Sequence, residues 1–343
     1  MTDLLPWRRA AVRDPYWDTI RYVSGTLVLF GHLVDQLHDR DGLVWLYVAT
    51  WPLRVPVFAI VAGYFSSAAP LTREAVRRLA WTLAVPYLVA GLLHSVQRWW
   101  MTGRWWFHVD TPAWGAWFLL SLLVWRLALP WLARLRWPVA YAVAAALAAG
   151  YAGGIGGWLA LSRTLCFLPF FLVGWQIRRR GAAALRPGVV WSGRAAVALL
   201  LGAGVAGWYA RHEVPYAWLR MEGAYGSAWG PLARAGVLLV GVAGGLALLR
   251  LMPRRRVPVV SWLGAGGMYV YVLHPLVLRP LLEWGAVAWV RSWPEQAVVP
   301  VMACALSAAL VGGLTVVPAA RRPAQRAARH GTRPVRLRLR RIG

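Results

Sequence analysis

Long apolar runs separated by short polar segments dominate the chain. Each run has about the 20 residues that are needed to cross ~30 Å of hydrocarbon. The pattern predicts an all-α, polytopic transmembrane bundle of about ten helices. The predicted spans are residues 17–37, 43–67, 79–97, 114–133, 138–154, 157–177, 189–210, 231–252, 259–282 and 297–318. A glycine-rich turn at residues 151–157 is the only break between the fifth and the sixth.

The segments between the runs differ in their arginine content. With a cytoplasmic N-terminus, every inside segment holds at least as many arginines as its outside neighbours, and most hold more. This is the positive-inside bias, and it favours both termini on the cytoplasmic side. We therefore expect an N-terminal segment (1–16), a transmembrane domain (17–320) and a basic tail (321–343). The tail is expected to be disordered on the anionic inner leaflet, and a contact with CoA or a partner is the alternative.

The composition supports a membrane protein, which we expect in the plasma membrane. Of the 343 residues, 59% are hydrophobic and 15% are charged, and the mean hydropathy is +0.50. The formal charge of +26 does not favour nucleic acid, because the arginines cluster where they set topology and contact membrane lipid. Cys166 and Cys304 lie in apolar runs, so neither a disulfide framework nor a metal site is expected.

The first run carries four ionisable residues along one stripe. Arg21 and His32 are eleven positions apart, which places them on one helix face roughly 16 Å from each other. Asp18 and Asp35 fall within about 60° of Arg21 on either side. Ionisable groups in a membrane helix usually face a cavity or one another. The stripe therefore predicts a polar path with a histidine that exchanges protons.

Other runs and segments also hold candidate binding residues. Arg54 lies within the second run, where a charge either faces a cavity or snorkels to the interface. Trp105 and Trp106 belong to an aromatic outside segment that would suit a sugar ring, or would form an interfacial belt. His274, in the ninth run, is either near the site or structural.

Six segments in order resemble the acyltransferase-3 family of integral membrane proteins, and most closely its fucose 4-O-acetylase-like branch. The resemblance covers residues 13 to about 318 and includes the Arg-x10-His spacing of the first helix. The basic loop departs from the usual Arg-x-x-Arg, because it reads Arg73-Glu-Ala-Val-Arg77-Arg78. The segments are Arg13–His32, Arg54–Phe65, Arg77–Tyr87, Ala116–Leu119, Phe167–Gly174 and Tyr271–His274.

The resemblance implies an O-acyltransferase. Such a protein moves an acyl group, commonly acetyl, from cytoplasmic acetyl-CoA to a hydroxyl of a sugar, a glycolipid or an exported small molecule. By motif position, His32 is the expected catalytic histidine and Arg21 its first-helix partner. Arg73, Arg77 and Arg78 are the expected CoA-phosphate ligands, although positive-inside topology explains them equally.

Acyl transfer from a thioester needs a base and a group that stabilises the oxyanion. A neutral His32 suits the base role, with an acyl-histidine as the covalent alternative. Asp35 could orient its ring or be a solvated carboxylate, and Arg21 could stabilise negative charge or pair with Asp18. A proton-coupled transporter or flippase remains the alternative function, although the charged stripe has no inverted repeat in the second half.

Overall fold

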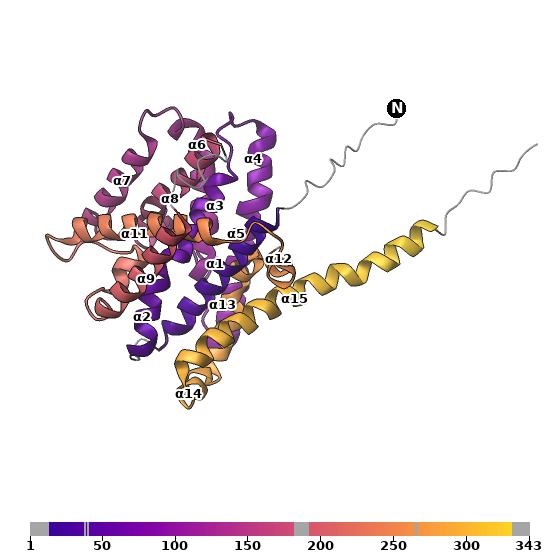
Figure 1. Cartoon of the computed structure of the whole chain (residues 1–343). Coiled ribbons are helices and arrows are strands. Elements are labelled where there is room, and N and C mark those ends of the chain that lie inside the picture. The colour runs from indigo at the N-terminus through magenta and orange to yellow at the C-terminus, as the bar shows by residue number, and fades with distance from the viewer. Residues whose placement is uncertain (1–13, 38, 40, 182–191, 265–266, 331–343) are drawn as a thin grey trace, which may run out of the picture.

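The computed structural model describes residues 14–37, 39, 41–181, 192–264 and 267–330. Within these ranges every regular element is a helix (Figure 1). The longer helices are α1 (Pro15–Val34), α2 (Asp41–Thr50), α3 (Val55–Tyr64), α5 (Val85–Thr102), α6 (Trp117–Leu132), α7 (Pro138–Ala148), α8 (Leu161–Arg179), α9 (Gly193–Tyr209), α11 (Gly230–Leu251), α13 (Gly267–Glu283) and α15 (Glu295–His330).

Shorter helices connect or extend these elements. They are η1 (Trp51–Leu53), α4 (Arg73–Leu79), η2 (Ala80–Ala84), η3 (Trp114–Ala116), η4 (Ala149–Tyr151), η5 (Trp158–Ala160), α10 (Tyr216–Arg220), α12 (Pro258–Gly264) and α14 (Ala286–Arg291).

The described residues confirm an all-helical fold with several candidate membrane spans. Six helical segments in the described ranges are long and apolar enough to cross a membrane. The other predicted spans also fall on helices, namely α1, α7, α9 and the α12–α13 pair. The total of about ten and the cytoplasmic termini stay predictions. The six segments are Gly42–Tyr64, Arg73–Thr102, Trp114–Leu132, Trp158–Arg179, Gly230–Leu251 and Glu295–Gly312.

Helix α1 occupies the centre of the bundle (Figure 1). It starts at the N-cap Asp14, whose side chain accepts a hydrogen bond from the Tyr16 amide, and Pro15 occupies its first turn. It packs against α3, α12, α13 and α15, and most of its side chains are buried. A Cβ on Gly264 would overlap the Asp18 carbonyl oxygen, so α12 crosses α1 at backbone contact distance. Asp18 is thus covered by α12, whereas the other ionisable residues of the stripe, Arg21, His32 and Asp35, are partly exposed.

Among the helices that the structure describes, α3 and α8 form the most extensive pair. A Cβ on Gly63 would overlap the Phe171 carbonyl oxygen, and one on Gly174 would overlap the Ile60 carbonyl oxygen. The two backbones therefore touch where both sequences supply a glycine. Close packing of small residues is a main source of helix association in lipid, and it makes α3 and α8 a rigid unit.

The second predicted span is a broken helix, which differs from the continuous helix predicted for 43–67. Helix α2 ends at Thr50, and α3 starts after the turn η1 and Arg54. Pro52 and Pro56 flank the break and cannot donate the backbone hydrogen bonds of a continuous helix. The Ser24 hydroxyl lies 2.9 Å from the Leu53 carbonyl oxygen and 2.7 Å from that of Arg54. It thereby satisfies backbone groups exposed by the break, as a membrane interior requires.

Helix α15 continues past the predicted end of the transmembrane domain. Its backbone is helical as far as His330, so the helix includes the first residues of the segment predicted to be a disordered tail (Figure 1). Residues 1–13 and 331–343 lie outside the described residues. The division into N-terminal segment, transmembrane domain and tail therefore stays a prediction.

Candidate active site

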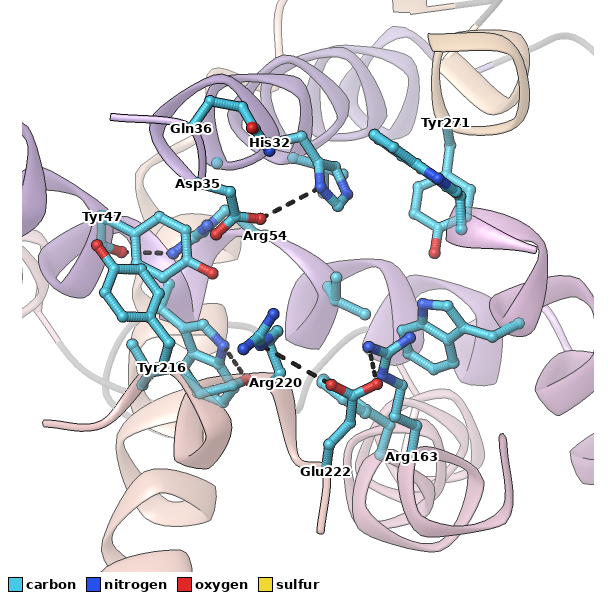
Figure 2. Close-up of a pocket in the computed structure, with 18 residues that line it drawn as sticks. His32, Asp35, Gln36, Tyr47, Arg54, Arg163, Tyr216, Arg220, Glu222 and Tyr271 are labelled. Carbon is cyan, nitrogen blue, oxygen red and sulfur yellow. Dashed lines mark hydrogen bonds and ion pairs between the residues drawn. The ribbon is translucent and has the colours of Figure 1, made fainter. Parts of the chain in front are cut away.

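A cavity of about 700 Å³ lies among α1, η1, α3, α8, the α9–α11 connection and α13 (Figure 2). It mixes ionisable and aromatic side chains with a few aliphatic ones. Its lining residues are Val28, Gly31, His32, Asp35, Gln36, Tyr47, Trp51, Arg54, Val55, Trp114, Trp117, Arg163, Phe167, Tyr216, Leu219, Arg220, Glu222 and Tyr271.

His32 and Asp35 form one wall, at the C-terminal end of α1. They are three residues apart, so both project from the same side of the helix. The His32 Nδ1 to Asp35 Oδ2 distance is 3.5 Å, and the two side chains are 33% and 23% exposed. A proton on Nδ1 directed at this carboxylate leaves the Nε2 lone pair free to accept a proton.

Arg54 reaches the same wall from the break between η1 and α3. It donates a hydrogen bond to the Tyr47 carbonyl oxygen, and its guanidinium stacks on the Tyr47 ring with a 4.0 Å separation from the centroid. Only 5% of Arg54 is exposed. A Cβ on Gly31 would overlap the Arg54 guanidinium. The glycine before His32 therefore makes room for a buried cation beside the His32–Asp35 pair.

A second charged group lies on the opposite wall (Figure 2). Arg163, in the first turn of α8, pairs with Glu222, and Arg220 Nε lies 3.8 Å from the other Glu222 oxygen. Together with Arg54 and Asp35, the cavity holds three guanidinium groups and two carboxylates. The guanidinium groups outnumber the carboxylates, so the cavity has an excess of positive charge. This excess would stabilise negative charge that develops on a reacting group.

Aromatic rings complete the lining near the ionisable groups. Trp114 lies 5.8 Å from the His32 ring, centroid to centroid. Its φ of 45° is in the left-handed region, which is strained for a bulky residue. Figure 2 shows the Tyr271 hydroxyl directed into the cavity. Tyr216, in the connection between α9 and α11, has its pKa raised to about 12 by burial, so it remains a neutral phenol at physiological pH.

A comparison with models of protein families identifies the class of the chain. The model of the acyltransferase domain that defines the acyltransferase-3 family matches residues 14–316. The chain belongs to the acyltransferase-3 family. No curated protein and no solved structure matches it. The match confirms the resemblance at the family level, and the fucose 4-O-acetylase-like branch stays a prediction.

This acyltransferase-3 protein brings together three of the predicted site residues on the cavity wall, namely His32, Asp35 and Arg54. His274 lies directly behind them, because its ring stacks on His32 at 5.0 Å with an interplanar angle of 26°. His274 is 1% exposed, and its Nδ1 is 2.9 Å from the Val270 carbonyl oxygen. It supports the His32 ring from the buried side and does not line the cavity.

The other predicted residues of this acyltransferase-3 protein lie elsewhere. Arg21 pairs with Asp18 at 3.0 Å and stacks on Phe65, 5.0 Å from the ring centroid. Trp105 and Trp106 are 55% and 44% exposed, on the loop after α5. The basic segment Arg73, Arg77 and Arg78 is exposed in α4, with Arg78 paired to Glu74. None of these residues lines the cavity, and their predicted roles stay predictions.

The cavity of the acyltransferase-3 domain also contains residues that the sequence analysis did not select. Arg163 is an ionisable residue inside an apolar run, which is the signal that drew attention to Arg54. Arg220 and Glu222 resemble ordinary loop residues, and nothing local in the sequence indicates that their connection folds over the cavity. Among the described residues, no group of three or more His, Cys, Asp and Glu could hold a metal ion.

Proposed function

We propose that this protein is a membrane O-acetyltransferase that moves an acetyl group from acetyl-CoA to an acceptor hydroxyl in the cavity, in the plasma membrane. The acceptor is a sugar, a glycolipid or an exported small molecule. Family membership supplies membrane acyl transfer. The observation that carries the proposal further is the His32–Asp35 pair on the wall of an approximately 700 Å³ cavity.

The proposed chemistry is direct transfer. His32 Nε2 takes the proton of the acceptor hydroxyl while its oxygen attacks the thioester carbonyl carbon. The tetrahedral intermediate collapses as the carbon–sulfur bond breaks, and the proton on His32 passes to the departing thiolate. The products are an ester and CoA thiol, with no net gain or loss of protons. Asp35 holds the ring orientation and stabilises the imidazolium that forms.

The remaining charges have a role at the same step. Negative charge develops on the carbonyl oxygen in the transition state, and Arg54 is the buried cation next to the base. A positioned cation in a partly desolvated site stabilises such charge more than water does. The opposite wall offers the Arg163–Glu222 pair and the Trp117 ring, over which Arg163 lies. The Tyr216 ring packs against Tyr47, beside Arg54. Rings beside polar groups suit a sugar-like acceptor, which is apolar on its faces and polar at its edges.

Turnover of the purified protein tests the base. In detergent, the wild type should consume acetyl-CoA and release free thiol when envelope extracts supply the acceptor. His32→Ala should lower the rate by roughly 10²–10⁴-fold, the usual contribution of a general base. His212→Ala is the matched control, because that histidine is exposed and outside the cavity; it should retain the wild-type rate.

Two results would contradict parts of the proposal. Retained turnover in His32→Ala would remove His32 from the base role. Absence of thiol release with every acceptor, together with uptake of a labelled glycan precursor into vesicles, would favour the transporter alternative. Mass spectrometry of envelope glycans and exported metabolites, with and without the gene, would identify the acceptor by a mass change of one acetyl group.

A further inference from the structure

A second pocket, of about 470 Å³, lies at the other ends of the helices that form the active site. Helix α3 runs from Arg54 at the cavity to this pocket, and α8 runs there from Arg163. At 1.5 Å per residue, the two sites are separated by roughly 15–25 Å along these axes. On the predicted topology this pocket faces the cytoplasm. Its lining is Ser66, Ser67, Ala68, Ala133, Trp175, Arg178 and Arg179.

Two exposed cations stand at the pocket in defined positions. Arg178 lies over the Tyr64 ring at 5.5 Å, and Arg179 lies over the Trp175 ring at 5.6 Å. Both occupy the last turn of α8, where a positive charge also interacts favourably with the helix dipole. No acidic side chain is among the described residues that line the pocket.

A third cation, Arg126 in the candidate membrane span of α6, is hydrogen-bonded to a residue that lines the pocket. The Arg126 Nε donates a hydrogen bond of 3.2 Å to the Ser66 hydroxyl, which in turn donates to the Ala62 carbonyl oxygen. Arg126 is only partly exposed, and no carboxylate of the described residues forms an ion pair with it. A partly buried charge without a counterion is costly, and an anion in the pocket would offset that cost.

Resting on the proposed function, we propose that Arg126, Arg178 and Arg179 form a phosphate site that holds the nucleotide end of the acyl-CoA donor. Guanidinium groups bind phosphate oxygens through paired hydrogen bonds. The Ser67 hydroxyl, which accepts from the Ala69 amide, adds a donor, and the Trp175 indole offers a ring near the cations. The phosphate of an anionic lipid headgroup would bind these residues in the same way. The test therefore distinguishes CoA from lipid as the source of the phosphate.

This assignment differs from the expected role of the α4 arginines. Arg73, Arg77 and Arg78 are exposed, and Arg78 is paired with Glu74 at 3.1 Å. They line neither the active-site cavity nor the α6–α8 pocket. The α6–α8 group combines a pocket, a partly buried cation and adjacent rings, whereas the α4 arginines are exposed.

Direct binding of CoA tests the site without requiring turnover. CoA is titrated calorimetrically into protein held in phosphatidylcholine nanodiscs, which present no anionic lipid. Arg178→Gln combined with Arg179→Gln should weaken the Kd of CoA at least tenfold, as should Arg126→Gln. The matched control is Arg255→Gln combined with Arg256→Gln, an exposed pair on the loop after α11; it should keep the wild-type Kd. A second titration uses 3′,5′-ADP, which carries the 3′-phosphate and the inner 5′-phosphate of CoA without the outer phosphate and the pantetheine arm.

Each outcome decides the proposal. Selective weakening in both α6–α8 variants, with CoA and with 3′,5′-ADP, supports it. Equal Kd values in all variants overturn it. If CoA does not bind and native mass spectrometry shows phosphatidylglycerol retention that depends on these arginines, the donor assignment is overturned and the site is a lipid headgroup site. CoA binding could depend on these arginines while His32→Ala keeps its turnover. That result would reject the mechanism proposed for His32 and leave the phosphate site standing.

Discussion

Gly31 sets how closely Arg54 approaches the His32–Asp35 pair. The guanidinium occupies the volume in which a side chain at position 31 would lie. Gly31 belongs to the first-helix motif that resembles the acyltransferase-3 family. The structure gives this glycine a physical role, which is to leave space for the Arg54 guanidinium. A cation held beside the base is expected to act on the transition state more than on folding.

Gly31→Ala should therefore lower the acetyl transfer rate about tenfold or more, since small displacements of a positioned group are costly in catalysis. The melting temperature should change little, because the displaced atoms belong to the end of a flexible side chain. Gly204→Ala is the control, because a Cβ there meets nothing within 4 Å. A Gly31→Ala protein with full activity would show that Arg54 has no part in the reaction.

Individual residues of the site could be predicted from the sequence where an ionisable side chain lies within an apolar run. His32, Asp35 and Arg54 were expected because ionisable groups are rare in apolar runs, and all three line the cavity. Arg163 gave the same signal. Glu222 and Arg220 did not, since their role depends on how the connection between α9 and α11 folds back over the bundle. That path is set by tertiary packing, which has no local sequence pattern.

At the scale of elements, the α3–α8 pair depends on two glycines, each of which faces the backbone of the partner helix. Gly63 and Gly174 both belong to motifs of the acyltransferase-3 resemblance. Periodicity predicted two helices there, but it could not show that they cross at these positions. The break at η1 was also missed, because hydropathy is continuous from 43 to 67 and only Pro52 and Pro56 interrupt the helical hydrogen bonding.

Replacement of either glycine should destabilise the protein. Gly63→Ala and Gly174→Ala each place a methyl group against a backbone carbonyl of the partner helix, which cannot move as a flexible side chain can. Overpacking of this kind costs typically about 1–3 kcal/mol. Tryptophan-fluorescence melting in detergent should show a lower transition temperature for both variants, with Gly204→Ala unchanged. Wild-type melting of the two variants would mean that the helices do not cross as closely as described.

At the scale of the whole molecule, arginine content predicts that alternate connections lie on opposite sides of the membrane. The predicted outside connections include Arg104, and the predicted inside ones include Arg255. Both residues are exposed. The same topology places the His32 cavity toward the outside and the Arg178 pocket toward the cytoplasm.

Labelling of single cysteines with a membrane-impermeant thiol reagent tests this topology. In a background with Cys166→Ala and Cys304→Ala, Arg104→Cys should react in intact cells. Arg255→Cys should react only after permeabilisation. Equal reactivity of both in intact cells would contradict the alternation, and the reverse pattern would invert the orientation.

The close packing of α3 against α8 has a consequence for the length of the donor. Gly63 faces the Phe171 carbonyl and Gly174 faces the Ile60 carbonyl, about 14–16 Å along the axes from Arg54 and Arg163. Because helices in backbone contact resist sliding past each other, the separation between the cavity and the Arg178 pocket is fixed by the helices themselves. The reach of the proposed donor, and not a helix movement, then decides whether its thioester arrives at His32.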